Sequence, residues 1–84
     1  MVLYGKENTI GNIDKIIQKM YNQPNGIRPE EADKVLRACG YRSDRQRGSH
    51  KQYIGVKGDT FTIVQNNPLK KYHVKVILGK IKNV

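Results

Sequence analysis

The chain is organised around residues 45–53, which run Arg45-Gln46-Arg47-Gly48-Ser49-His50-Lys51-Gln52-Tyr53. Gly48 and Ser49 predict a tight turn, because glycine accepts a positive φ and serine can hydrogen-bond its own backbone. His50 is then expected to begin a strand, with the turn open beside it. The stretch places this histidine, one of two in the chain, among cations on both sides.

The length and the charge distribution limit what the chain can be. Its 84 residues suffice for one domain with a single modest core. We expect a helical extension at residues 1–26 and a core at residues 27–84. Of the 16 Lys and Arg residues, ten lie in residues 41–84 with only two acids, a net of +8 out of +9 for the chain. Such a basic half indicates a polyanionic partner, which is nucleic acid, an anionic membrane or an acidic protein.

The sequence lacks the features of membrane-spanning, secreted, disulfide-bonded and metal-dependent proteins. No stretch approaches the roughly 18 consecutive apolar residues of a membrane span, and residues 1–4 are too short for a signal-peptide core. We therefore expect a cytoplasmic protein with no membrane partner. The single cysteine, Cys39, cannot form an internal disulfide or complete a metal knuckle. The scattered acids show no two-metal or zinc spacing and there is no phosphate-binding loop, so we expect no metal and no small-molecule cofactor.

Two helices are predicted before the stretch. The first runs from about Asn8 or Thr9 to about Tyr21. Its apolar residues share one face at helical spacing and are Ile10, Ile13, Ile16, Ile17, Met20 and Tyr21. That face fits either a partner protein or the domain's own core, and the core is favoured. The second helix begins at Pro29, carries Glu30 and Glu31 in its first turn, buries Ala32, Val35, Leu36 and Cys39, and ends at Gly40.

Three strands and a last helix complete the prediction. The strands cover Tyr41 to about Arg45 or Arg47, His50 to Val56 and Thr60 to Gln65, with Gly58-Asp59 as a two-residue hairpin loop. Residues 69–82 fit a strand or a helix, and Asn67 as N-cap before Pro68 favours a helix. The predicted class is α+β, with a three-stranded antiparallel sheet that leaves one face to solvent. Its mostly polar first strand is expected to be an edge strand or a one-sided strand.

Strand alternation predicts which way the side chains point. If the aromatic ring of Tyr53 faces the helices, Lys51 shares its side and His50 points to the open face. Ile54 and Val56 would then share the side of His50, which alternation does not explain. Tyr53 is expected in the core rather than as a base-stacking surface.

The order helix–strand–strand–strand–helix from Pro29 onward resembles a double-stranded-RNA-binding-domain fold. Gly40-Tyr41 after a helix, followed by Arg47-Gly48-Ser49-His50 and Tyr53, resembles the HicA family of toxin ribonucleases. The stretch from Tyr72 to Leu78 resembles the last helix of longer members, and the resemblance covers roughly residues 28–81. Gln65-Asn66-Asn67 depart from the proline and second histidine of many members, which removes a helper histidine there. The resemblance implies a toxin that degrades messenger RNA and is neutralised by a HicB antitoxin.

Metal-free RNA cleavage fits these residue types. RNA carries its own nucleophile, the 2′-hydroxyl, and histidine suits proton transfer because its reference pKa is about 6.5. We expect His50 to be the general base or acid, with Lys51 or Arg47 offsetting the charge of the phosphate. The expected phosphate and RNA contacts are Arg45, Arg47, Gly48, Ser49, Lys51, Lys70, Lys71 and Lys75.

Alternatives remain open for both histidines and for the function. His50 is otherwise a polar strand residue without a special role. His73 is either a partner acid or a partly buried structural residue, and its place beside Leu69 and Ile77 on the last helix favours the second. The alternative functions are a non-catalytic RNA-binding module on the same basic surface and a small interaction protein that binds an acidic partner.

Overall fold

The computed structural model describes residues 8–82, with side chains from residue 11 onward. The elements follow in the order α1 (Asn8–Asn22), α2 (Pro29–Ala38), β1 (Arg42–Arg47), β2 (His50–Ile54), β3 (Thr60–Val64) and α3 (Lys71–Ile81). This confirms the α+β class and the helical assignment of the last segment. None of the helices within residues 8–82 has the length and apolar character needed to cross a membrane.

The sheet is antiparallel with the order β1-β2-β3, so β1 is an edge strand as predicted. Gly48 has a φ of 56° and forms the tight turn with Ser49, which brings Arg47 opposite His50. On the other side of β2, His50 lies opposite Val64. Directly opposed residues of an antiparallel pair share a face, so this register determines which side chains meet.

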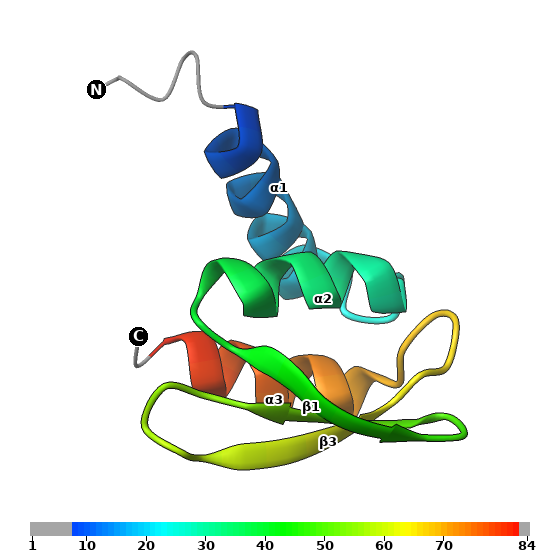
Figure 1. Ribbon diagram of the computed structural model, residues 1–84. Coiled ribbons are helices and arrows are strands. Elements are labelled where there is room, and N and C mark those ends of the chain that lie inside the picture. Colours follow the sequence, from blue (N-terminus) through cyan, green and yellow to red (C-terminus); the bar gives the residue numbers. More distant parts are fainter. Residues whose placement is uncertain (1–7, 83–84) are drawn as a thin grey trace.

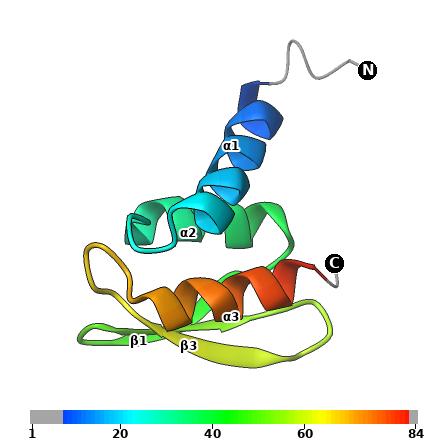
Figure 2. The same cartoon turned by 180° about the vertical axis from the view of Figure 1, so that it is seen from behind.

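The helices cover only one face of the sheet. Helices α2 and α3 lie against that face, and α1 extends from them on the side away from the sheet (Figure 1). The view from behind shows α3 running along the strands beneath α1 and α2 (Figure 2). The core consists of apolar side chains from all three helices and the sheet, chiefly Met20, Ile27, Val35, Leu36, Tyr53, Ile63, Leu69, Val74 and Ile77.

Both ends of α2 form as the sequence predicts. At its start the backbone N–H of Arg28 donates a hydrogen bond of 2.9 Å to the carboxylate of Glu31, which satisfies a donor that the helix leaves unpaired. At its end Gly40 adopts a φ of 94°, and the N–H of Tyr41 returns to the carbonyl of Leu36 at 2.9 Å. This is a glycine-based C-terminal cap, which turns the chain into β1.

The β2–β3 hairpin differs from the predicted two-residue loop. Strand β2 ends at Ile54 and the loop spans Gly55 to Asp59, closed by a hydrogen bond of 2.8 Å from the N–H of Gly55 to the carbonyl of Asp59. A side chain at Gly55 would collide with Asp59 and Tyr41. Because Val56 belongs to this loop and not to β2, it is 86% exposed and does not share the strand face of His50. Ile54 remains on that face, opposite Arg42.

The start of α3 also differs from the prediction. The helix begins at Lys71, and Lys70, rather than Asn67, is its N-cap residue, with an extended backbone (φ −66°, ψ 143°). The residue before the cap is held by the rest of the fold, because the side chain of Leu69 is buried and its N–H donates to the carbonyl of Ile27 at 2.7 Å. The tertiary contact at Leu69 therefore delays the helix beyond the Asn-Pro signal.

The apolar face of α1 packs on the core with one exception. Met20 is fully buried, and Ile13, Ile16 and Ile17 are partly buried against the core, as predicted. Tyr21 is instead 61% exposed, because it lies at the margin of this face. The side chain of Ile10 lies outside the described residues.

Candidate active site

His50 and two arginines meet on the open face of the sheet. Arg47 lies opposite His50, and Arg45 lies opposite Gln52, on the neighbouring strand. Together with Thr62 of β3 these residues line a shallow depression of about 280 Å³. The register places all of them on the face that the helices leave uncovered.

A β-bulge at Asp44 makes this arrangement possible. The register shifts between Ser43, which lies opposite Tyr53, and Arg45, which lies opposite Gln52. Ser43 therefore shares the helix side with Tyr53, whereas Arg45 faces the open side only two residues later. Bulges are known to redirect side chains in this way next to functional sites. Since Arg42 lies opposite Ile54, β1 presents three arginines on the face of His50.

Lys51 lies on the other side of the sheet, where alternation places it. Its Nζ is 3.1 Å from Asp33 of α2, which also accepts hydrogen bonds from the Tyr53 hydroxyl at 2.6 Å and from Arg37 at 2.7 Å. Burial raises the pKa of Asp33, but these three hydrogen bonds outweigh it and hold the pKa below its usual value. Lys51 therefore forms an ion pair that links β2 to α2, and it does not line the depression.

His73 is buried at the edge of β3. It is 7% exposed, and its Nε2 accepts a hydrogen bond of 3.4 Å from the N–H of Val64, the residue opposite His50. Burial and, second, the charge of His50 lower the pKa of His73. A buried, neutral imidazole that accepts a backbone hydrogen bond favours the structural role over that of a partner acid.

The remaining predicted contacts fall into two groups. Gly48 and Ser49 form the exposed turn beside the depression, and α3 begins at this same end of the sheet with exposed Lys70 and Lys71 (Figure 1). The turn is joined to the segment before α3, because the N–H of Gln65 donates to the carbonyl of Ser49 at 2.7 Å. Lys75 lies further along α3, where it lines a separate groove between α1 and α3.

Gln52 and Thr62 also line the depression, although neither was among the site residues predicted from the sequence. Gln52 follows His50 by two residues, so strand alternation alone is enough to place it on the same face. Thr62 becomes visible only through the β2–β3 register, which pairs it with Gln52. An amide and a hydroxyl can each donate a hydrogen bond to a phosphate oxygen, which makes both residues suitable neighbours for the arginines.

The depression has the chemistry of an anion site with a proton carrier. Two guanidinium groups can bind phosphate oxygens in bidentate fashion, and the imidazole beside them can take up or release a proton. Within residues 8–82 there is no group of three or more His, Cys, Asp or Glu side chains arranged to hold a metal ion.

The amino-acid sequence was compared with known protein families, curated proteins and solved structures. The family model described as "HicA toxin of bacterial toxin-antitoxin" matches residues 29–82. The match extends from α2 to α3, includes every residue of the depression, and leaves α1 outside. Neither a curated protein nor a solved structure matches the chain. Because the family model covers more than half of its residues, the chain belongs to the HicA family of toxins of bacterial toxin–antitoxin systems.

Proposed function

We propose that this toxin is a cytoplasmic endoribonuclease that cleaves messenger RNA at the open-face depression without a metal ion, and that a HicB-like antitoxin neutralises it. The observation that carries the proposal is the meeting of His50 with Arg45 and Arg47 in one solvent-open hollow. Membership of the family supports a toxin with a cognate antitoxin.

The proposed reaction uses the 2′-hydroxyl of the RNA as the nucleophile. A base removes its proton, the 2′-oxygen bonds to the adjacent phosphorus, and the bond from phosphorus to the 5′-oxygen breaks as that oxygen receives a proton. His50 performs one of these proton transfers. The products are a 2′,3′-cyclic phosphate on one fragment and a 5′-hydroxyl on the other.

The arginines hold the phosphate and offset the charge that develops on it. Arg47 lies directly opposite His50, and Cβ atoms of such pairs are about 5 Å apart. A phosphate bound by Arg47 is therefore within reach of the imidazole. Arg45 contributes a second guanidinium, and Gln52 and Thr62 line the same hollow. In this proposal the arginines take the stabilising role that the sequence also offered to Lys51.

Lys70 and Lys71 extend the anion-binding surface beyond the depression. They are exposed at the start of α3, at the end of the sheet that carries the turn (Figure 1). Contacts of this kind bind RNA through its phosphates without reading the sequence, and they weaken as salt rises.

The test compares one RNA oligonucleotide with its analogue that carries a single 2′-deoxy nucleotide at the cleavage site, both in EDTA. We expect the purified protein to cut only the RNA and to leave cyclic phosphate and 5′-hydroxyl ends. Cleavage of the deoxy analogue, 3′-hydroxyl ends, or loss of activity in EDTA would contradict the mechanism. Binding of both oligonucleotides without cleavage would favour the non-catalytic RNA-binding module.

A further inference from the structure

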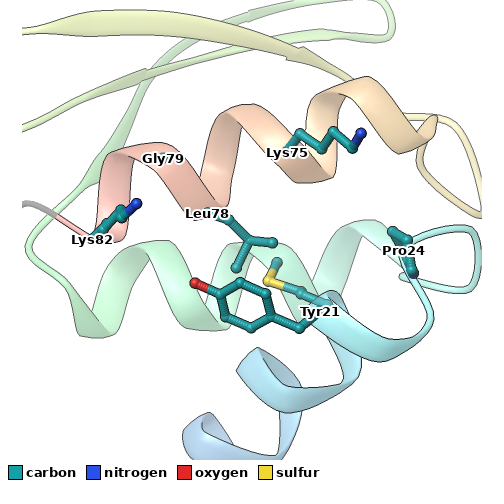
Figure 3. A pocket seen from close by; sticks show the side chains of 7 residues that line it. Tyr21, Pro24, Lys75, Leu78, Gly79 and Lys82 are labelled. Atoms are coloured by element: carbon teal, nitrogen blue, oxygen red, sulfur yellow. The ribbon is translucent and has the colours of Figure 1, made fainter.

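A second concave surface lies on the helical side of the molecule, where α1 ends beside α3. It has a volume of about 350 Å³ and is formed by Met20, Tyr21 and Pro24 on one side and by Leu78 with two lysines on the other. Figure 3 shows Tyr21 of α1 and Leu78 of α3 meeting at the middle, with Lys82 at one end and Lys75 and Pro24 towards the other. We call this surface the α1–α3 groove; it lies on the helical side, away from the open face that carries His50.

The centre of the groove is apolar. The ring of Tyr21 is 61% exposed and supplies most of this apolar surface, Leu78 is 9% exposed beside it, and Met20 is fully buried behind them. In Figure 3 the Tyr21 ring and the Leu78 side chain lie next to one another at the middle of the groove. A large aromatic side chain beside an apolar floor is typical of the centre of a protein-binding surface.

The two ends of the groove are cationic. Lys75 and Lys82 come from the α3 side and are seven residues apart, which is two helical turns or about 10 Å along the axis. Neither lysine pairs with a carboxylate among residues 11–82, whereas Lys19, Lys51 and Lys80 each do so. Within the part of the chain that the structure describes, no carboxylate therefore neutralises the positive charge at either end.

We propose that the α1–α3 groove binds an acidic amphipathic segment of a partner protein. Apolar side chains of the segment lie on Tyr21, Pro24 and Leu78, and two carboxylates about 10 Å apart pair with Lys75 and Lys82. On a helical segment this corresponds to acids at positions i and i+7. RNA phosphates would satisfy the lysines and a base would stack on Tyr21, but the aliphatic surfaces of Leu78 and Pro24 match apolar side chains better than bases; RNA is therefore the competing occupant that the test separates.

The groove is a feature of this chain rather than of the matched region alone. The family match begins at residue 29, so the wall formed by Met20, Tyr21 and Pro24 lies outside it. The inference is also independent of the proposed nuclease activity, because it concerns binding on the opposite side of the sheet.

The test uses the full chain labelled with ¹⁵N and a synthetic helical peptide with leucines between two glutamates seven residues apart. We expect saturable shifts of the amide signals of Tyr21, Leu78 and their neighbours. The double variant Lys75→Glu/Lys82→Glu is expected to bind about tenfold more weakly or worse. The matched control Lys34→Glu/Lys57→Glu changes the net charge equally on exposed sites away from the groove and is expected to bind within about twofold of the wild type.

Three results would overturn the inference. The first is the absence of saturable shifts at the groove, and the second is an equal loss of affinity in both double variants, which indicates diffuse charge attraction. The third is displacement of the peptide by a single-stranded RNA that shifts the same amides, which assigns the groove to RNA.

A Tyr21→Ala variant tests the apolar part of the groove. It should weaken peptide binding without altering the far-UV circular dichroism spectrum. No arm depends on cleavage, so failure of the nuclease proposal leaves the result unaffected.

Discussion

At the scale of residues, three arginines of β1 share a face, but only two of them line the depression. Arg45 and Arg47 do so, whereas Arg42 lies opposite Ile54 at the other end of the strand. Replacing either Arg45 or Arg47 by Gln should lower the single-turnover cleavage rate by about a hundredfold, because one preorganised donor to the developing charge is lost. Arg42→Gln removes the same charge from the same face and should cost far less.

Equal losses in all three variants would contradict a localised phosphate site and would indicate a general effect of positive charge. Rates should be measured at saturating protein, so that weaker RNA binding does not hide a loss in the chemical step.

The lowered pKa of His73 leads to a second prediction, which concerns the pH dependence of stability. Because burial and the charge of His50 lower its pKa below the ordinary value of 6.5, the unfolded chain binds a proton at this position more readily than the folded chain. The stabilising contribution is complete above about pH 6.5 and is lost as the pH falls through the lowered pKa. Urea unfolding of the wild type should therefore give a smaller free energy of unfolding as the pH is lowered below about 6.5.

The variant His73→Gln should flatten that dependence, since its side-chain amide can still accept a hydrogen bond from Val64 but does not titrate. The carboxylates of Glu31 and Asp33 have lowered pKa values, so their protonation affects stability only in more acidic solution. Their effect is therefore separate from that of His73. An unchanged slope in His73→Gln would contradict the assignment.

The predicted site residues show what strand alternation can and cannot determine. It correctly placed Tyr53 and Lys51 on the helix side and His50 on the open side. It did not reveal that Lys51 meets Asp33, because Asp33 comes from a helix and the contact depends on how that helix docks. The bulge at Asp44 was likewise not visible, since a polar edge strand has no hydrophobic pattern from which its register can be derived.

At the scale of elements, the β2–β3 loop depends on the absence of a side chain at Gly55. A Cβ there would lie 2.7 Å from a ring carbon of Tyr41 and would collide with Asp59. These two side chains are joined by a hydrogen bond of 3.0 Å from the Tyr41 hydroxyl to the Asp59 carboxylate. Gly55→Ala should therefore lower the free energy of unfolding by about 1–3 kcal/mol, the usual cost of overpacking.

Gly26→Ala is the matched control, since a Cβ there meets its nearest atom at 3.7 Å, an ordinary contact distance. Denaturant unfolding of the two variants checks the prediction. Equal stability of Gly55→Ala and the wild type would contradict the packing of Tyr41 and Asp59 over the loop.

Elements with strong local signals were predicted well, and those set by distant contacts were not. Pro29, the first-turn acids and Gly40 correctly bounded α2, and Gly48 correctly placed the first hairpin. The Gly58-Asp59 loop was wrong because Gly55 packs beneath Tyr41, which belongs to a different part of the chain. The predicted start of α3 was wrong because the hydrogen bond between Leu69 and Ile27 also joins residues that are far apart in the sequence.

At the scale of the whole molecule, α1 is connected to the matched core by packing and by charge. Its Met20 is buried in the core, and Lys19 forms an ion pair of 3.0 Å with the partly buried Glu31 of α2. We propose on these grounds that the extension and the core unfold as one domain. A change that stabilises α1 alone should then stabilise the whole chain.

Gly11→Ala tests this proposal, because a Cβ at Gly11 meets nothing within 4 Å and alanine favours a helix by up to about 1 kcal/mol over glycine. We expect a single thermal transition, coincident in far-UV and near-UV circular dichroism, that shifts upward by several degrees, about 4–8 °C per kcal/mol. Two separate transitions, with only the helical one shifted, would show that α1 unfolds independently.

Whether the protein is a His50-dependent ribonuclease is decided by following RNA integrity over time with purified wild type and His50→Ala, both in EDTA. We expect the wild type to cut and His50→Ala to be slower by about 10²–10⁴-fold, with its fold and RNA affinity kept. Lys57→Ala, which removes an exposed cation from the β2–β3 loop, should cut like the wild type. Cleavage by His50→Ala at the wild-type rate, or a wild type that binds RNA and leaves it intact, would contradict the claim.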